Sequence, residues 1–355
     1  MRNICANCKK TDGPLKTCTA CRSVRYCGVD CQRSHRPEHR KECKRIAKEL
    51  KLVTALGRVQ VSEVSTPRID MDDPDLFKTP PKPDCAICML PMPYGGPKES
   101  KYFDCCGKMV CTACALESYR VDVYKSGLEN MLPKECCPFC RTMLATKNTD
   151  EVAQIESRVK KNDENATFQL AMYYYEGAFG IPKDGIKYFT LLHTAAEQRS
   201  SAACYCLAWY YNPRTCSIDP HFNARECGIK PTEEKMMHYY KEAARLGHVQ
   251  ARCDLGLFAF RSNDFTLAHR HWMLSVARGH DLSLENFEDE RSDGRISERK
   301  FSEIKAAHEN GKEEMASIER DRALRADFDF ARYCLLFNEE EVEKMKRRSE
   351  ANKSM

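Results

Sequence analysis

The stretch CANCKKTDGPLKTCTACRSVRYCGVDCQRSHRPEHRKEC, residues 5–43, contains eight side chains spaced as ligands for two metal ions. Their spacing is C-x2-C-x9-C-x2-C-x5-C-x3-C-x7-H-x3-C. Closed structural zinc sites use four thiolate or imidazole donors, and a C-x2-C knuckle turns two sulfurs toward one ion while its backbone amides bond them. The predicted ligands are Cys5, Cys8, Cys18, Cys21, Cys27, Cys31, His39 and Cys43.

This spacing resembles the MYND zinc finger over its whole length. In that family the ligand pairs interleave. The resemblance therefore implies one zinc on Cys5, Cys8, Cys27 and Cys31, and a second on Cys18, Cys21, His39 and Cys43. Neither zinc then has a vacant position, and a closed site activates no water, so a binding module is favoured over a hydrolytic centre. His35 is the nearest alternative to His39 as a ligand.

MYND fingers are known to dock short proline-containing peptides, and residues 22–26 (RSVRY) with Gln32 resemble their docking surface. The alternative is that the finger only caps the fold. In that case its basic residues form a solvated helix face, consisting of Arg33, Arg36, Arg40 and Lys41. SET-domain lysine methyltransferases also carry MYND fingers, but the rest of this chain has the features of other modules, so that reaction is set aside.

The chain changes character after this finger. Residues 44–56 have a helix-forming composition and Gly57 offers a stop. Between Ser65 and Asp84 lie five prolines and a run of aspartates, which predict an extended acidic linker. We therefore expect a domain boundary near residue 80.

A second cysteine cluster follows and resembles a RING finger over residues 84–143. Its cysteines come as Cys85-x2-Cys88, Cys105-Cys106, Cys111-x2-Cys114 and Cys136-Cys137-x2-Cys140. In that cross-braced family the first and third pairs share one zinc, which implies a site of Cys85, Cys88, Cys111 and Cys114. The second and fourth pairs share the other zinc, and Cys137 and Cys140 would close it.

The second pair departs from the family pattern. RING fingers usually place Cys-x-His there, whereas this chain has Cys106-Gly107-Lys108. Lysine is protonated at neutral pH and is a poor zinc ligand. The predicted fourth site is therefore Cys105, Cys106, Cys137 and Cys140, with a site that is unfilled, completed by water or assisted by Cys136 as the alternatives.

RING fingers bind ubiquitin-conjugating enzymes through an apolar residue in the first knuckle and a proline in the last, with a cation beside the final ligand. Ile87, Pro138 and Arg141 occupy these positions. The resemblance implies a noncovalent mechanism, in which the finger holds conjugating enzyme and ubiquitin while a substrate lysine attacks the thioester. Ligase-inactive relatives with the same C-P-x-C-R motif only bind partners, so a scaffold stays open as the alternative.

A repeat begins near residue 163. The block Ala166-x3-Leu170-Ala171-x-Tyr173 recurs from Ala203 and from Ala251. Apolar residues at i, i+4 and i+7 form one helical stripe, and the small residue at i+5 lets a second helix approach closely. A second helix follows each block, and residues 283–311 form a degenerate fourth unit. These helix pairs predict an α-solenoid.

The repeat pattern resembles Sel-one-like repeats, relatives of tetratricopeptide repeats. Glu176-Gly177-x2-Gly180-Ile181-x2-Asp184 fits their inter-helix turn. Such solenoids serve as adaptors that present a concave surface to protein clients.

The remaining cysteines and the C-terminal region are expected to have structural roles. The insertion at residues 211–234 carries Cys216, His221 and Cys227 at irregular spacing, and we expect a partly ordered loop there and not a third metal module. Cys204, Cys206 and Cys253 are expected to be buried among the helices, and Trp209 and Trp272 to be core residues. Beyond Lys312, an apolar patch at residues 328–337 predicts a capping helix. The basic run 344–348 is interpreted as a solvated helix end, with a nuclear signal as the alternative.

Composition limits the class of protein. The chain has 355 residues and 22 cysteines, sixteen of them within residues 1–140. No run reaches the roughly 18 apolar residues of a spanning helix, and no signal peptide precedes Cys5, so we expect a reducing cytoplasmic or nuclear location without membrane partners. Fifteen ligand thiolates and four zinc ions would change the formal net charge of +5 to about −2. Nucleic acid is therefore an unlikely partner.

The predicted organisation has six segments along the chain. They are a MYND-type finger with a trailing helix (1–57), an acidic linker (58–82), a RING-type finger (83–143), a second linker (144–162), a solenoid (163–311) and capping helices with a charged tail (312–355). Four zinc ions are expected, and their chelation should unfold the fingers but not the repeats, since small fingers derive folding free energy on the order of 10 kcal/mol from each metal. Two functions follow from this organisation: a RING-type ubiquitin ligase that recruits substrates through its other modules, or a non-catalytic scaffold.

Overall fold

The described part of the chain divides into two compact units. The computed structural model describes residues 4–10, 15–21, 24–59, 74–78, 80–94, 100–115, 118, 137–142, 148–216, 219, 221–318 and 320. The first unit joins Met1–Lys78 to Ile155–Ala251, and the second joins Thr79–Gln154 to Arg252–Met355. Each unit thus combines one cysteine-rich region with part of the helical region.

The first unit begins with a small hairpin and a long helix. Strands β1 (Lys16–Thr17) and β2 (Arg25–Tyr26) pair antiparallel with Lys16 opposite Tyr26. Helix α1 (Val29–Val59) contains Pro37 and continues past Gly57, so the helix expected at 44–56 is only its second half. A helical glycine costs only about 1 kcal/mol relative to alanine, which is why Gly57 does not stop it. Helix α1 packs against α5 (Gly185–Glu197).

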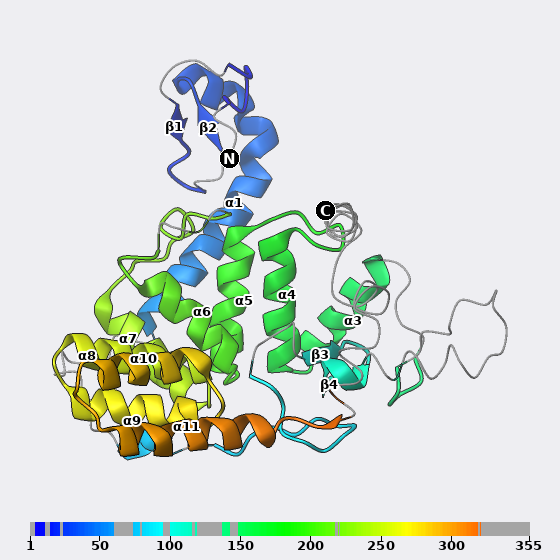
Figure 1. The fold of residues 1–355 in the computed structure, drawn as a ribbon. Helices are drawn as coiled ribbons and strands as arrows, with labels where there is room; N and C mark the ends of the chain where they lie inside the picture. The colour runs from blue at the N-terminus through cyan, green and yellow to red at the C-terminus, as the bar shows by residue number, and fades with distance from the viewer. Residues whose placement is uncertain are drawn as a thin grey trace, which may run out of the picture. The chain divides into compact units, whose positions relative to one another are not determined.

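Two helical hairpins complete this unit. Helix α4 (Glu164–Glu176) packs on α5, and α6 (Ser201–Tyr211) packs on α7 (Glu233–Arg245), while α5 also contacts α6. The short 3-10 helix η1 (Pro74–Phe77) contacts α7. Side-chain oxygens of Asp163, Asp184, Ser200 and Thr232 cap the four helices by accepting backbone N–H bonds in their first turns. Figure 1 shows α4 and α5 side by side.

The insertion between α6 and α7 is held by one carboxylate. The hydroxyls of Tyr175 and Tyr210 donate to Asp219 at 3.0 and 2.6 Å, and the backbone N–H groups of His221 and Phe222 bond its other oxygen. The described part of this insertion is therefore anchored to α4 and α6, which is more order than its sequence indicates.

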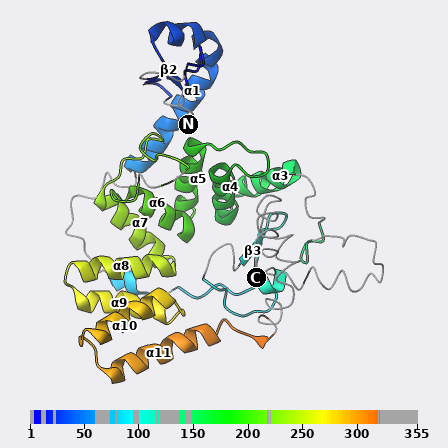
Figure 2. The same ribbon diagram turned by 45° about the horizontal axis from the view of Figure 1, so that its top comes forward.

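The second unit has a hairpin of its own and further paired helices. Strands β3 (Ser100–Phe103) and β4 (Lys108–Cys111) pair antiparallel, with Ser100 opposite Cys111. Helices α9 (Phe265–Val276), α10 (Asp281–Ser292) and α11 (Glu298–Glu313) contact one another, as Figure 2 also shows. Helix α8 (Val249–Arg261) begins in the first unit and precedes α9, and α3 (Asn148–Val159) lies in the predicted linker 144–162.

The helices thus follow one another as neighbouring pairs, α4 with α5, α6 with α7 and α10 with α11. Helix α8 pairs with α9 through Trp272, which lies against Gly256 and bonds the Cys253 carbonyl. This confirms the expected fold class, namely zinc-finger regions combined with an α-solenoid of helical hairpins. Each repeat block from the sequence forms the first helix of a pair. The expected apolar patch at 328–337 and the basic run 344–348 lie outside the described residues. In the described part of the chain, no helix combines the length and apolar character needed to span a membrane.

Buried side chains match the expected core of the repeats. Cys204 and Cys253 are buried and Trp272 is 1% exposed, whereas Cys206 and Trp209 are only half-buried. His193 lies among them, between the hydroxyls of Tyr211 and Tyr239 at 3.3 and 3.2 Å, and burial lowers its pKa to about 3. This neutral imidazole joins α5 to both helices of the next pair.

The small residue of the third repeat has a specific packing role. A Cβ added at Gly256 would lie 2.3 Å from Nε1 of Trp272, whose indole N–H donates to the carbonyl of Cys253 at 3.2 Å. Helices α8 and α9 can therefore approach this closely only because position 256 has no side chain.

Gly256→Ala should consequently destabilise the protein, although alanine favours helix formation. Overpacking typically costs about 1–3 kcal/mol and alanine recovers about 1 kcal/mol, so we expect a net loss on the order of 1 kcal/mol in urea unfolding. Gly28→Ala is the control, because a Cβ there meets nothing within 4 Å. Equal or higher stability of Gly256→Ala would contradict the packing argument.

Candidate metal centres

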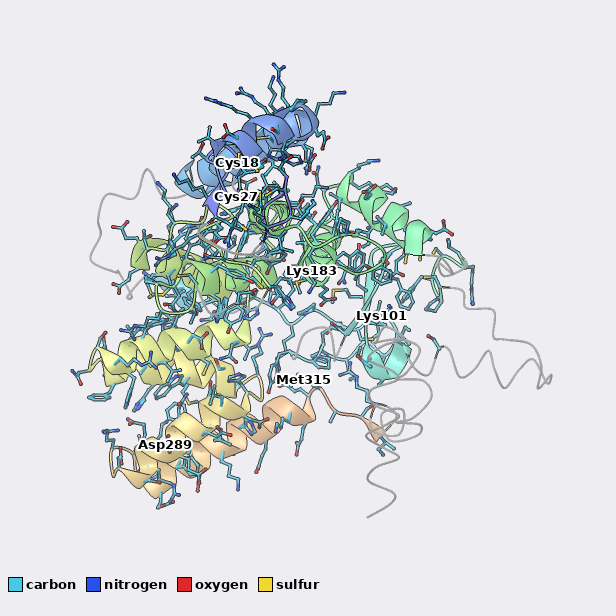
Figure 3. All side chains as sticks on the ribbon, turned by 90° about the horizontal axis from the view of Figure 1, so that it is seen from above. Cys18, Cys27, Lys101, Lys183, Asp289 and Met315 are labelled. Carbon is cyan, nitrogen blue, oxygen red and sulfur yellow. The ribbon has the colours of Figure 1, made fainter. Side chains whose placement is uncertain are left out.

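The first unit gathers the eight predicted ligands of the N-terminal finger into two groups. In each group the ligand atoms all lie within 4.8 Å of one another. One group is Cys5, Cys8, Cys27 and Cys31, and the other is Cys18, Cys21, His39 and Cys43. Figure 3 labels Cys18 and Cys27 beside α1, the helix that carries Cys31, His39 and Cys43.

The sulfur separations fit zinc and not disulfides. Cys8 lies 3.5 Å from Cys27, and Cys18 lies 3.8 Å from Cys43. With zinc–sulfur bonds of about 2.3 Å, the edge of a regular tetrahedron is about 3.8 Å, whereas a disulfide is about 2.0 Å long. The donor sets, four sulfurs in one group and three sulfurs with one imidazole in the other, are those of structural zinc sites.

The structure shows that His39, and not His35, belongs to the ligand group. Nε2 of His39 lies 3.2 Å from the sulfur of Cys21, whereas Nδ1 of His35 lies 3.0 Å from the Tyr26 hydroxyl. The two imidazoles are stacked, with ring centroids 5.6 Å apart. Burial and the neighbouring His35 lower the pKa of His39, which favours the neutral imidazole that zinc requires. His35 thus stacks beside His39 but is not a member of the ligand group.

Three C-x2-C knuckles share one backbone arrangement. The N–H four residues after the first cysteine donates to that cysteine's carbonyl, from Lys9, Met89 and Arg141 at 3.0, 2.9 and 3.0 Å. These three residues have φ values of 61°, 58° and 60°. Left-handed backbone is unusual for residues with a side chain, so closing the knuckle must offset its cost. The same local fold therefore occurs in both cysteine-rich regions.

The second unit gathers two further groups. One is Cys85, Cys88, Cys111 and Cys114, and the other is Cys105, Cys106, Cys137 and Cys140, again within 4.8 Å. The β3–β4 hairpin supplies cysteines to both groups. Cys105 and Cys106, of one group, lie in the turn from β3 to β4, and Cys111, of the other group, ends β4. Cys105 lies 3.4 Å from Cys140, and Cys106 lies 3.6 Å from Cys137.

The residue at the usual histidine position takes no part in this group. Lys108 begins strand β4 and is exposed, while neighbouring Cys105 supplies the fourth sulfur. Cys136 lies outside the described residues. All four groups have the donor chemistry of zinc, so the protein can hold up to four zinc ions.

The pKa values of the clustered thiols favour binding of a cation. Burial acts to raise the pKa of Cys85, but backbone N–H groups of Cys88, Cys111 and Ile87 lower it to about 7. In the first finger, neighbouring sulfurs of Cys31 and Cys8 raise the pKa of Cys27 to about 12. Cys85 is thus poised to ionise, while hydrogen bonds with the neighbouring sulfurs keep the proton on Cys27. A bound divalent ion would take the place of such protons and hold the sulfurs as thiolates, and this structural role is the chemistry zinc supplies here.

A residue that sequence reasoning missed supports the Cys85 group. The Arg320 guanidinium is buried and donates to the sulfur of Cys88 at 3.1 Å and to the carbonyls of Leu90 and Pro91 at 3.2 and 2.9 Å. It also bonds the Met315 carbonyl. Arg320 thus ties the first knuckle of the second region to the segment after α11. Its sequence gave no signal, because it lies in a charged stretch.

The predicted partner-contact residues lie on two of the knuckles. Ile87 is 40% exposed, and the neighbouring Met89, which the sequence analysis did not select, is exposed as well. Pro138 is half-buried and Arg141 is exposed. In the first finger Gln32 is exposed but Tyr26 is only 2% exposed, and Arg22 and Ser23 lie outside the described residues. Tyr26 is therefore a core residue of that finger and not part of an open docking surface.

The insertion cysteines do not add another centre. Cys216 and Cys227 are buried, and His221 lies 3.0 Å from the Lys183 ammonium through Nδ1. Among the described residues, the Cys, His, Asp and Glu groups that could hold a metal are the four given above.

Comparison with known proteins identifies the first of these regions. The family model of the MYND finger matches residues 5–43. Residues 5–43 are therefore a MYND zinc finger, a class of domain that binds zinc and has the potential for protein–protein interaction. No curated protein matches the chain.

The two histidines of the MYND finger provide a matched test. His39→Ala should weaken one of the four zinc sites, because it removes a ligand, so that a chelator takes one ion at a lower concentration than from the parent protein. His35→Ala should keep all four ions under the same conditions. Native mass spectrometry during chelator titration counts them. The reverse order of the two variants would assign the ligand to His35.

Arg320→Gln tests the support of the second region. Loss of a side chain that bonds a metal ligand typically costs about 10–100-fold in metal affinity, so one zinc should leave correspondingly faster to a colorimetric chelator. Arg299→Gln on α11 is the control, since its nearest ion pair is to Glu303 at 3.5 Å. Identical release rates for both variants would mean that Arg320 does not stabilise the site.

Proposed function

We propose that this zinc-binding protein is a RING-type ubiquitin-protein ligase whose MYND finger and helical repeats recruit protein substrates. The observation that carries the proposal is the interleaving of residues 85–140. Sulfurs of the first and third cysteine pairs form one group, and those of the second and fourth pairs form the other. The RING resemblance implies this cross-brace, and replacement of the usual histidine by Cys105 leaves the donor set complete.

The placement of three side chains supports contact with a conjugating enzyme. Ile87 and Met89 make the first knuckle apolar at its surface, and Arg141 is exposed directly after the last ligand. An arginine there offers several N–H donors in a planar fork, which suits it to bridge two proteins. Zinc-bound thiolates are poor nucleophiles, so the reaction would proceed by positioning the conjugating enzyme's thioester and not through a covalent relay.

The MYND finger and repeats would supply recruitment in this proposal. Proline-containing peptides are the proposed ligands of the finger, with Gln32 exposed on α1. Protein clients are the proposed ligands of the solenoid. The absence of a histidine at position 108 favours one second candidate, a scaffold that binds partners without transferring ubiquitin.

The discriminating measurement is discharge of ubiquitin from a panel of charged conjugating enzymes onto free lysine, with protein shown to hold four zinc ions. Ile87→Ala and Arg141→Ala should each lower the discharge rate by about tenfold, since truncating a central interface residue typically costs on the order of 1–2 kcal/mol. Leu282→Ala and Arg299→Ala should leave it unchanged. Leu282 is a close match for Ile87, because it is 41% exposed.

Three outcomes are informative. Loss of discharge in both finger variants but neither control supports the ligase. Silence of the metal-loaded protein across the whole panel overturns it and leaves the scaffold. Discharge that survives both finger substitutions would place the contact elsewhere and reject the roles given to Ile87 and Arg141.

A further inference from the structure

A pocket opens in the second unit among helices α8, α9 and α10. Its volume is about 360 Å³, within the range of about 300–1,000 Å³ typical of ligand sites. Phe260 of α8 and Trp272 of α9 line one part of it, and Asp289, Glu290 and Asp293 line another. Figure 3 labels Asp289 on α10. Aromatic faces and carboxylates together are the surroundings that attract an organic cation.

One wall of the pocket already contains such a cation. The guanidinium carbon of Arg295 lies 5.4 Å from the centre of the Phe260 ring and 5.5 Å from that of Phe265. Its Nη1 bonds Glu290 and lies 3.0 Å from Asp293. The protein's own arginine therefore demonstrates how a guanidinium is bound here, stacked on aromatic rings and paired with carboxylates.

The pocket contains more carboxylates than Arg295 alone can neutralise. Glu290 is only 1% exposed and shares its two oxygens between Arg295 and His269, whose Nε2 lies 3.2 Å away. Asp289, in contrast, is exposed and forms no ion pair with the residues that the structure describes. One cation thus faces three carboxylates around an open volume, which leaves negative charge for a second cation.

We propose that this pocket binds an arginine side chain of a partner protein. A guanidinium is favoured over an ammonium because its planar fork pairs with carboxylates in two directions and its flat face can pack on the part of the Phe260 ring that is exposed, whereas Trp272 is only 1% exposed. The proposal specifies the chemistry of the clients and so rests on the proposed recruiting role of the repeats. It does not require ubiquitin transfer, because the pocket is remote in sequence from the zinc ligands at 85–140.

The two tryptophans make the site observable in the full chain. The protein has two tryptophans, of which Trp272 lines the pocket and Trp209 belongs to α6 in the other unit. Fluorine NMR of zinc-loaded protein carrying 5-fluorotryptophan should therefore give two resonances, assigned with Trp209→Phe. The probe is a capped glycine–serine peptide with one central arginine, compared with the same peptide carrying lysine or neutral citrulline.

The arginine peptide should shift the Trp272 resonance in a saturable way and leave that of Trp209 unchanged. The lysine peptide should bind more weakly than the arginine peptide. The citrulline peptide should lose at least about tenfold in affinity, since neutral citrulline offers the carboxylates no positive charge. Asp289→Asn should weaken arginine binding by about threefold to tenfold, as expected for one lost charge pair. Glu285→Gln is the matched control, because it removes the same charge from α10 at an exposed position outside the pocket lining.

The proposal is overturned if the Trp272 resonance does not move at millimolar peptide, if citrulline binds as well as arginine, or if Glu285→Gln weakens binding as much as Asp289→Asn. These results differ from failure of the ligase proposal. A protein silent in ubiquitin discharge but with a Trp272 resonance that responds to arginine would keep the pocket and lose only the transfer reaction.

Discussion

Mutual repulsion of sulfur atoms is the constraint on which both cysteine-rich regions depend. The chain brings fifteen cysteine sulfurs and one imidazole into four groups whose ligand atoms lie within 4.8 Å. Thiolates this close repel one another unless a cation lies between them. Without one, hydrogen bonds with Cys31 and Cys8 keep the proton on Cys27 and raise its pKa to about 12. A zinc ion binds the thiolates that would otherwise repel one another. Its binding stabilises hairpins that are too short to build a hydrophobic core. Folding of these regions and metal binding are therefore one process.

The zinc groups also organise the helices. Cys31, His39 and Cys43 lie on α1, and α1 packs against α5 of the first hairpin pair. In the second unit, Arg320 links the knuckle at Cys88 to the segment that follows α11. Each finger is thereby continuous with helical structure in its own unit. Substitution of a zinc-binding residue should therefore also affect helix packing, since the helix that carries the donor atom also makes packing contacts.

Sequence spacing predicted much of this architecture because zinc ligands recur at characteristic intervals and the apolar residues of packed helices recur at the period of the helix. The intervals around Cys5–Cys43 predicted the MYND finger, and the small residue at Gly256 predicted close helix packing. Two kinds of feature could not be predicted. Local stop signals do not by themselves set helix ends, so α1 passes Gly57, and α3 forms at Asn148–Val159, within the expected linker. Contacts such as that of Arg320 join residues far apart in sequence, and its charged surroundings do not distinguish it from solvated neighbours.

Each compact unit is built from two separated stretches of the chain, with the second unit's first stretch inserted between those of the first unit. During synthesis, the MYND finger must therefore wait for residues up to 251 before its unit is complete. The second cysteine-rich region emerges earlier than the helices α9–α11 of its unit. Nascent chains thus pass through a stage at which both cysteine-rich regions have emerged before the later helical stretches of their units, and zinc bound at that stage would shield the cysteine thiols from oxidation.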